Sequence, residues 1–379
     1  MMLPGFHDAI ATGQTWADCA EACARRLGPC GGPGALGFLY VTDVLAPDFG
    51  AILSVLRDAT KVEQWVGGVG WGVCGRRREV FGKSPAVSVL VADFPPDGFR
   101  LLGTLLNDGD MPDPDVLDWA GAVAPVLGIV HGDADNGRLG WIVEDLADIT
   151  EGYLVGGLTG GSARGGAMPN QLAGLPTRGG LSGVLLSAHV PVAVAGTQGC
   201  VRVGGYHTVT ETRRSAIARL DGRRPLDVLC EETGVHSRED LRGLAGVVHI
   251  GLPVGASDLG AYTVRALMAV DPRTGWIAAD ARLSPGDRVC FVRRTQDAAE
   301  TDMRAMLRRL RTRLGVSRPR GGLYVSCHGR GPELFGGRNR EMTLIAEELG
   351  DFPLTGFFGG GEIRHNQLYT HSGVLTVFL

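Results

Sequence analysis

The chain has 379 residues, of which 44% are hydrophobic and 21% are charged, and its formal net charge is −4. This composition is typical of a globular protein, and the length exceeds that of one ordinary core, so two domains are expected. The slightly acidic balance argues against a surface for nucleic acid or anionic membrane. The sequence shows no apolar run of 18 residues and no signal-peptide pattern, so a cytoplasmic location is expected.

The eight cysteines include no Cys-x-x-Cys pair, which gives no support for a structural zinc site, and reduced thiols are expected. Cys19 and Cys23 are four residues apart in a predicted helix and share one face of it. The unusual feature is the count of 59 glycines, more than twice the ordinary share of about 7%. Most are paired and follow strand-like runs, where glycine permits tight turns or the close approach of another backbone.

Three stretches repeat one order of elements: a strand, a loop, a helix, a glycine-rich strand and a return strand. In the first copy the strand covers residues 34–43, the helix 47–60 and the glycine-rich strand 64–75. The corresponding glycine-rich segments are GYLVGGLTGGSARGG (152–166) and FPLTGFFGGGEI (352–363). We interpret the copies as duplicated parts of a domain rather than an open array, because their period is longer than that of solenoid repeats. The alternative is a chance likeness among glycine-rich α/β segments.

The region between the second and third copies has a different pattern. It predicts β-strands, a helix that begins near Pro225, and a turn at 271–275 between two strands. Residues 298–315 then predict an amphipathic helix with Met303 and Leu307 on its apolar face. We therefore expect an α/β (α+β) fold of two related domains, 1–190 and 191–379, with mixed or antiparallel sheets covered by helices.

Three segments carry a resemblance to a known family: GGLYVSCHGRG (321–331), PLTGFFGGGEI (353–363) and the segment from Gly199 to Leu229. The chain resembles the FIST family of bacterial sensory proteins of signal transduction. The glycine-rich strand ends WVGGVGWGVCG (65–75) and YLVGGLTGGS (153–162) resemble its N-terminal half, although the family's Gly-Cys-Ser-Thr string is replaced here. The resemblance implies a ligand-sensing module that acts on a separate signalling protein such as a kinase or cyclase. It implies amino acids as ligands, or haem and nitric oxide.

The residues themselves favour a small polar ligand. The guanidinium fork of Arg330 suits a carboxylate or phosphate, and Glu362 suits an ammonium group. The alternative is that Arg330 and Glu362 pair with each other. Flanking glycines expose backbone N–H groups that can form an anion nest. The candidate ligand-binding residues are Trp71, Gly157, Thr159, Gly160, Ser162, Ser326, Cys327, Arg330, Gly360, Gly361 and Glu362.

Two other classes of function remain open. A haem-binding gas sensor would need an axial ligand, for which the candidates are His207, His328, His365 and His371, although the sequence holds no metal-ligating string. A cysteine-dependent enzyme would use Cys327 with His365 or His371 as its base. Neighbouring residues on an extended segment point to opposite faces, so His328 is not expected to activate Cys327. We expect no catalytic residue, no metal and no cofactor, with haem as the alternative.

Overall fold

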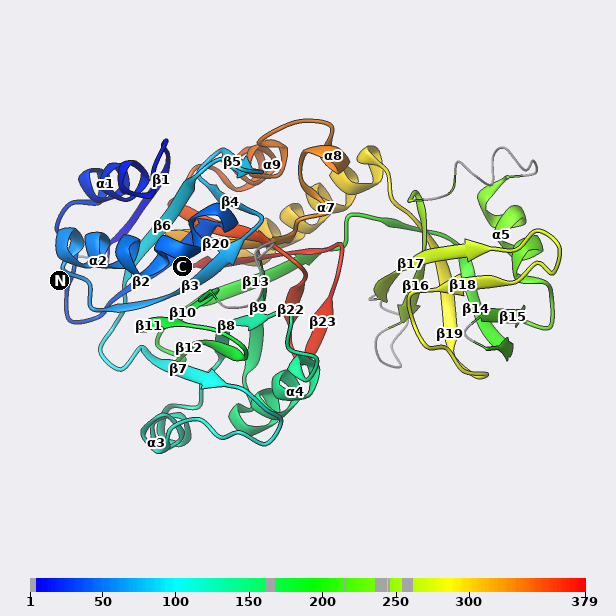
Figure 1. The fold of residues 1–379 in the computed structure, drawn as a ribbon, viewed down its shortest axis with the longest axis horizontal. Helices are drawn as coiled ribbons and strands as arrows, with labels where there is room; N and C mark the ends of the chain where they lie inside the picture. Colours follow the sequence, from blue (N-terminus) through cyan, green and yellow to red (C-terminus); the bar gives the residue numbers. More distant parts are fainter. Residues whose placement is uncertain (1–4, 161–167, 215, 236–243, 245, 254–261) are drawn as a thin grey trace. The chain divides into compact units, whose positions relative to one another are not determined.

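The computed structural model describes residues 5–160, 168–214, 216–235, 244, 246–253 and 262–379. The chain forms two compact units. Unit 1 holds residues 1–197 and 304–379, and unit 2 holds residues 198–303. Both the expected mixture of helices with mixed and antiparallel sheets and the division into two bodies are present (Figure 1).

In the described part of the chain, unit 1 contains three sheets, and each has six strands in the same spatial order. The order is an edge strand, the return strand, the first strand, the glycine-rich strand and a two-stranded hairpin. The first sheet contains β1 (Phe6–Thr12), β6 (Ala86–Asp93), β2 (Ala35–Thr42), β3 (Gln64–Gly70), β10 (Gln171–Ala173) and β11 (Leu175–Thr177). The second contains β7 (Phe99–Leu105), β12 (Leu181–Leu186), β8 (Leu127–Asp133), β9 (Tyr153–Thr159), β22 (Glu362–Arg364) and β23 (Gln367–Tyr369). The third contains β13 (Val192–Thr197), β24 (Gly373–Phe378), β20 (Gly321–Cys327), β21 (Leu354–Gly359), β4 (Gly72–Gly75) and β5 (Arg78–Phe81).

Each copy donates its hairpin to the sheet of another copy. The β4–β5 hairpin of the first copy pairs with β21 of the third, β22–β23 of the third pairs with β9 of the second, and β10–β11 of the second pairs with β3 of the first. In Figure 1 the red hairpin β22–β23 lies beside the green strand β9. The exchange closes a cycle, so the three copies form one interlocked body with pseudo-threefold connectivity.

This exchange explains why the chain does not divide at residue 190. The predicted domain of residues 191–379 is not one body, because its third module is held in unit 1 by β21 pairing with β4 and by β22 pairing with β9. Unit 2 is an insertion in the third copy, between β13 and β20. The repeat inferred from the sequence is present, but as three parts of one unit rather than as two copies in one domain and one in another.

At one position in each copy, glycine is required for a steric reason. Within each sheet the first strand and the glycine-rich strand are parallel, and the backbones approach so closely that a Cβ atom would lie 1.7–1.9 Å from a carbonyl oxygen. Two of these glycines also have a φ of +151°, which side-chain-bearing residues rarely adopt. The glycines are Gly67, Gly156 and Gly356, which face the oxygens of Leu39, Val130 and Tyr324, respectively.

Helices cover the outer faces of the sheets. The capping box of Thr15 and Asp18 starts α1 (Trp16–Leu27), whose Cys19 and Cys23 are fully buried beside α2 (Phe49–Thr60), which follows the short helix η1 (Asp43–Asp48). Further described helices of unit 1 are α3 (Pro114–Val123), α4 (Leu139–Thr150), α8 (Gly331–Phe335) and α9 (Arg340–Leu349), and unit 1 also includes α7 (Gln296–Leu314) from Arg304 onward. A central hydrophobic cluster joins residues from all three sheets, including Phe38, Ile129 and Phe357.

Unit 2 contains a closed barrel. Its strands are β14 (Val201–Arg213), β15 (Ala216–Leu220), β18 (Ile277–Ala279), β17 (Tyr262–Val270), β16 (Val248–Pro253) and β19 (Arg288–Arg293). Helix α5 (Pro225–Thr233) begins at the predicted proline. Helix α7 (Gln296–Leu314) covers the predicted amphipathic segment, and its Met303 and Leu307 are fully buried as expected.

Candidate functional site

The candidate site lies where the three glycine-rich strands end. Three backbone hydrogen bonds join these ends in a cycle, one bond from each copy to the next. They run from Trp71 N to Phe358 O (2.9 Å), from Gly360 N to Leu158 O (2.9 Å) and from Gly160 N to Val69 O (3.2 Å). Trp71, Gly160 and Gly360 therefore occupy equivalent positions in the three copies and lie together. All three are among the candidate residues chosen from the sequence.

The indole of Trp71 lies against the two glycines of this cycle. A Cβ atom at Gly160 would lie 2.4 Å from the ring, and one at Gly360 would lie 3.5 Å from it. The imidazole of the exposed His328 stacks on the indole with 4.8 Å between ring centroids and 25° between planes. The backbone N–H of His328 donates to the backbone carbonyl of Gly359 over 2.8 Å. The half-exposed indole and the imidazole thus form an aromatic surface at the strand ends, suited to the apolar part of a small ligand.

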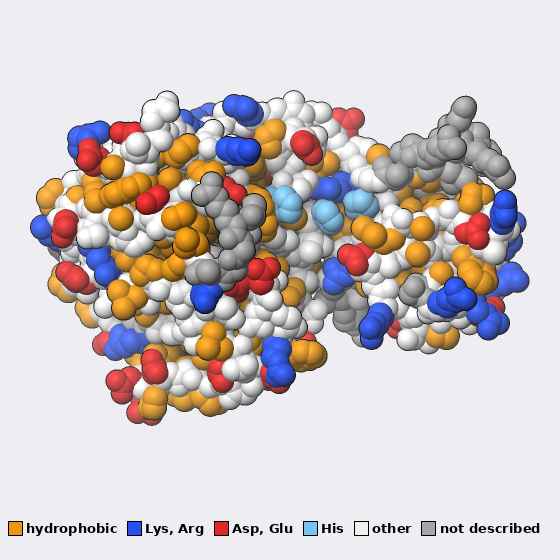
Figure 2. Space-filling model, in the orientation of Figure 1, with side chains coloured by type: hydrophobic (Ala, Val, Ile, Leu, Met, Phe, Trp, Pro, Cys, Tyr) orange, Lys and Arg blue, Asp and Glu red, His pale blue; other side chains and the backbone are white. Residues whose placement is uncertain are grey.

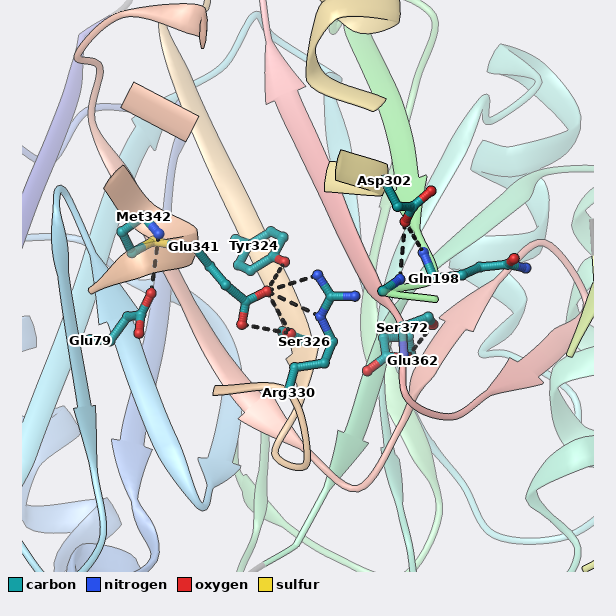
Figure 3. Close-up of polar contacts among 11 residues, drawn as sticks. Glu79, Gln198, Asp302, Tyr324, Ser326, Arg330, Glu341, Met342, Glu362 and Ser372 are labelled. Carbon is teal, nitrogen blue, oxygen red and sulfur yellow. Dashed lines mark hydrogen bonds and ion pairs between the residues drawn. The ribbon is translucent and has the colours of Figure 1, made fainter. Parts of the chain in front are cut away.

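Two residues after Gly360, at the start of β22, is the buried carboxyl group of Glu362, which is 1% exposed. Its Oε2 accepts hydrogen bonds from the N–H of Ser372 (3.2 Å) and from the Ser372 hydroxyl, whereas its Oε1 has no hydrogen-bond partner among the described residues (Figure 3). Burial and the neighbouring Cys327 thiol raise the pKa of Glu362 well above its ordinary value, although Ser372 and Arg330 oppose the shift. This shift favours the neutral form of the carboxyl group. Because Oε2 accepts two hydrogen bonds, Oε1 is the oxygen that would carry the proton of that form.

Arg330 pairs with Glu341, a residue of α9 that the sequence interpretation missed, and not with Glu362. Both side chains are fully buried, and Nε and Nη2 of Arg330 donate to Oε2 of Glu341 over 3.1 and 3.0 Å. The same carboxylate accepts from the hydroxyls of Tyr324 (2.5 Å) and Ser326 (3.3 Å). Figure 3 shows the guanidinium between Glu341 and the pair Glu362–Ser372. Arg330 therefore closes a buried network and also lies near the carboxyl group of Glu362.

A second buried acid adjoins this network from the first copy. Glu79 on β5 accepts hydrogen bonds from the N–H groups of Asn339 (3.0 Å) and Met342 (3.1 Å) at the start of α9. Burial and the nearby Glu341 carboxylate raise the pKa of Glu79 to about 8. One feature of the sequence could have indicated that Glu341 is buried. Glu341 shares a helical face with Leu344 and Ile345, so a carboxylate lies on an otherwise apolar face. The sequence holds no such signal for Glu79, which lies 260 residues from Asn339.

The remaining candidates have structural contacts. Gly157 pairs with Glu362 across β9 and β22, and a Cβ atom there would lie 2.4 Å from Val325. Thr159 is fully buried and its hydroxyl donates to Gly132 O over 3.0 Å. The Gly361 carbonyl accepts from Leu158 N. Cys327 is 3% exposed, and Ser162 lies outside the described residues.

The histidines considered as ligands make contacts of different kinds. His207 is in unit 2, where its Nδ1 contacts Asp221 (2.6 Å) and its Nε2 contacts Glu232 (2.8 Å). His365 contacts Asn366 through Nδ1 over 2.9 Å. Within the described ranges we find no group of three or more His, Cys, Asp or Glu side chains placed to hold a metal ion. No helix in the described part of the chain is long and apolar enough to cross a membrane.

Family models match almost the whole chain, the FIST N domain over residues 35–223 and the FIST C domain over residues 225–365. The chain belongs to the FIST family. FIST domains are sensory domains of signal transduction, so the resemblance noted in the sequence is confirmed. The boundary between the two models falls within the β15–α5 connection of the barrel, so neither model corresponds to one compact unit.

Similar proteins occur in mycobacteria. The chain is 29% identical over 375 residues to Uncharacterized protein Rv0628c of Mycobacterium tuberculosis, covering 95% of each chain. It is 32% identical over 240 residues to Uncharacterized protein Mb0898c of Mycobacterium bovis, covering 61% of this chain and 62% of that protein.

Proposed function

We propose that the protein is a sensor of a small molecule, an amino acid or small carboxylate, which binds at the glycine-rich strand ends beside Trp71, His328 and Glu362. The observation that carries the proposal is Oε1 of Glu362, a buried carboxyl oxygen with no hydrogen-bond partner in the described chain. Burial raises the pKa of Glu362 and so favours its neutral form. A buried polar group without a partner costs about 1–3 kcal/mol, which a ligand oxygen accepting the proton of that form would recover.

The surroundings of Glu362 favour a carboxylate. In its neutral form Glu362 would donate a hydrogen bond to a ligand oxygen, whereas the sequence interpretation gave it the role of an acceptor for an ammonium group. The guanidinium of Arg330 lies close enough to act on the charge of Glu362, and it would also favour a ligand anion placed there. The surface of Trp71 and His328 would contact the apolar part of the ligand.

Binding at Glu362 requires a movement, because the side chain is 1% exposed. The strand end at Gly360 and the segment at Ser372 border it and would have to shift. Such a shift gives a sensor the two states that it needs, since a ligand signals only through its different affinity for each. The output would pass to a separate signalling protein such as a kinase or cyclase.

The first test is a thermal-shift screen of the full chain with amino acids, small carboxylates, nucleotides and hemin. A ligand at 100 times its Kd adds about 2.7 kcal/mol and should raise Tm by a few degrees. Glu362→Gln keeps a neutral donor and should keep the response, whereas Glu362→Leu should abolish it. The matched control is Gln171→Leu, at the equivalent position of the second copy. A carboxylate response that survives in Glu362→Leu would reject the site.

A haem sensor is the second candidate, and one cavity favours it. A cavity of about 1070 Å³ borders α3 and α4, with an apolar wall that includes Leu117 and Val126 and with His365 at its edge. Because Oδ1 of Asn366 can only accept, Nδ1 of His365 donates and leaves the Nε2 lone pair available to an iron. Hemin should then give a Soret band that His365→Ala abolishes. A spectrum without that band would reject this candidate.

A cysteine-dependent enzyme stays the third possibility. The imidazole of His328 stacks on Trp71, so it does not serve the thiol of Cys327 in this arrangement. Iodoacetamide labelling decides the question: an enzyme requires Cys327 to react faster than the other thiols, and uniform labelling would count against it.

A further inference from the structure

A second cavity of unit 1 has a lining that includes none of Trp71, His328 and Glu362, and it has a different chemistry. Its volume is about 700 Å³, within the usual range for small-molecule sites of about 300–1,000 Å³. Three segments line it: the end of β1 with the following turn, the stretch from β5 to β6, and the residues before α9. The lining residues are Thr12, Gly13, Gln14, Arg78, Glu79, Val80, Phe81, Lys83, Ser84, Pro85, Arg338 and Asn339.

The charge of this cavity is opposite to that of the chain. The lining includes the cations Arg78, Lys83 and Arg338 and one acid, Glu79, whereas the whole chain carries a net charge of −4. Glu79 forms no ion pair with these cations in the described chain, and both of its carboxyl oxygens accept backbone hydrogen bonds at the start of α9. Its raised pKa also makes it partly neutral near pH 8.

The cations are available to a ligand. Nη2 of Arg78 donates to the hydroxyl of Thr12 over 3.0 Å, a neutral partner that leaves the charge uncompensated. Lys83 and Arg338 are exposed, and neither pairs with a carboxylate of the described chain. Like charges collected without acids around a concave surface raise the local concentration of anions.

We propose that this cavity binds a small multivalent anion, an organic phosphate or a di- or tricarboxylate. The guanidinium groups of Arg78 and Arg338 can each hold two oxygens of such an anion, and the Lys83 ammonium adds a point charge. The hydroxyls of Thr12 and Ser84 are further donors. Val80, Phe81 and Pro85 form an apolar wall that would contact a carbon skeleton. This site is separate from the one at Glu362 and does not depend on it.

The test measures anion binding to the full chain by calorimetry and thermal shift at constant ionic strength set with sodium chloride. The probes are inorganic phosphate, pyrophosphate, succinate and citrate. At least one should bind the wild type, and its affinity should fall at least tenfold in Lys83→Ala/Arg338→Ala. The control is Arg26→Ala, which removes an exposed charge from α1 and should leave the affinity unchanged. Which probes bind distinguishes a phosphate site from a carboxylate site.

Two outcomes overturn the proposal: no multivalent anion binds the wild type, or the double variant binds as well as the wild type. The double variant should fold, because both side chains are exposed and unpaired in the described chain, and its Tm without anion checks this. Repeating the titration in Glu362→Leu separates the two sites. Binding at the cavity persists in that variant, whereas binding at the strand ends does not.

Discussion

The second and third copies place different side chains at one equivalent position. Gln171 and Glu362 each begin a donated hairpin, opposite the residue that follows the close-approach glycine of the receiving strand. Both are buried, and both leave Oε1 without a hydrogen-bond partner in the described chain. The first copy has Val73 there, opposite Phe357. The fold therefore accepts an apolar, an amide or a carboxyl side chain at this position. The neighbouring residues determine which contacts each side chain makes.

The surroundings of the two polar side chains differ more than the side chains do. Gln171 donates through Nε2 to the carbonyls of His131 and Gly180, so it serves as a link between two sheets. Glu362 accepts from Ser372 and lies near Arg330, which is held by Glu341. The third copy thus holds a buried ion pair of Arg330 and Glu341 near Glu362, whereas the amide of Gln171 in the second copy bonds to two backbone carbonyls.

The largest effect is expected from breaking the network of the third copy. Arg330→Ala should destabilise unit 1 by about 3–5 kcal/mol, because it leaves Glu341 buried without its charged partner. Urea unfolding followed by tryptophan fluorescence measures this cost. Arg25→Ala breaks an exposed pair with Glu21 and should cost less than about 1 kcal/mol. If the two variants cost the same, the buried network does not stabilise the fold.

A close-approach glycine should matter nearly as much in the second copy. Gly156→Ala would place a Cβ atom 1.7 Å from the Val130 carbonyl oxygen at a φ of +151°, so a loss of about 3 kcal/mol is expected from overpacking and strain together. The control is Gly121→Ala in α3, where nothing lies within 4 Å and alanine should add up to about 1 kcal/mol of stability. Thermal unfolding of both variants distinguishes them, and an unchanged Tm for Gly156→Ala would contradict the steric explanation.

Two buried groups should respond to pH in opposite directions. Burial lowers the pKa of His131 to about 3 from 6.5, so the unfolded chain binds more protons between these values and stability falls as pH decreases below 6.5. Burial and Glu341 raise the pKa of Glu79 to about 8 from 4.5, so the folded chain binds more protons there and stability falls as pH rises from 4.5 to 8. Glu362 acts in the same direction as Glu79.

Chemical denaturation across pH 3–9 measures how the free energy of unfolding depends on pH. His131→Phe should reduce the loss of stability as pH falls below 6.5, and Glu79→Gln should reduce the loss of stability as pH rises toward 8. If Glu79→Gln leaves the loss toward pH 8 unchanged, the carboxyl of Glu79 is ionised in the folded protein and the assigned pKa is wrong.

The smallest effect is expected in unit 2, at a histidine that is not deeply buried. Burial lowers the pKa of His207, but hydrogen bonds to Asp221 and Glu232 outweigh it and raise the pKa above 6.5. The barrel then gains stability from this contact below pH 6.5 and loses it as pH rises through the raised pKa. An NMR titration of the His207 ring should show the raised pKa, and Asp221→Asn should lower it. A midpoint at or below 6.5 in the wild type would contradict the described contacts.

Much of the fold could be predicted from the sequence, because its signals are local. Helical spacing marked the segment that became α7, proline marked the start of α5, and paired glycines marked the strand ends of all three copies. Of the predicted site residues, Trp71, Gly160 and Gly360 lie together, and their role in ligand binding stays a prediction. The partner of Arg330 was not found, because Glu341 is read locally as one more polar residue of a helix.

The sequence by itself determined the repeated module and the family, since both depend on the order of residues within short segments. Only the tertiary structure decided which sheet receives each hairpin and that the third copy joins the first two in one unit. It also decided that Glu79 accepts hydrogen bonds from the start of α9. These features depend on contacts between residues more than 100 positions apart, and one hairpin can satisfy its hydrogen bonds equally well on several strands. The choice among them is made by the packing of the whole unit, which no local pattern records.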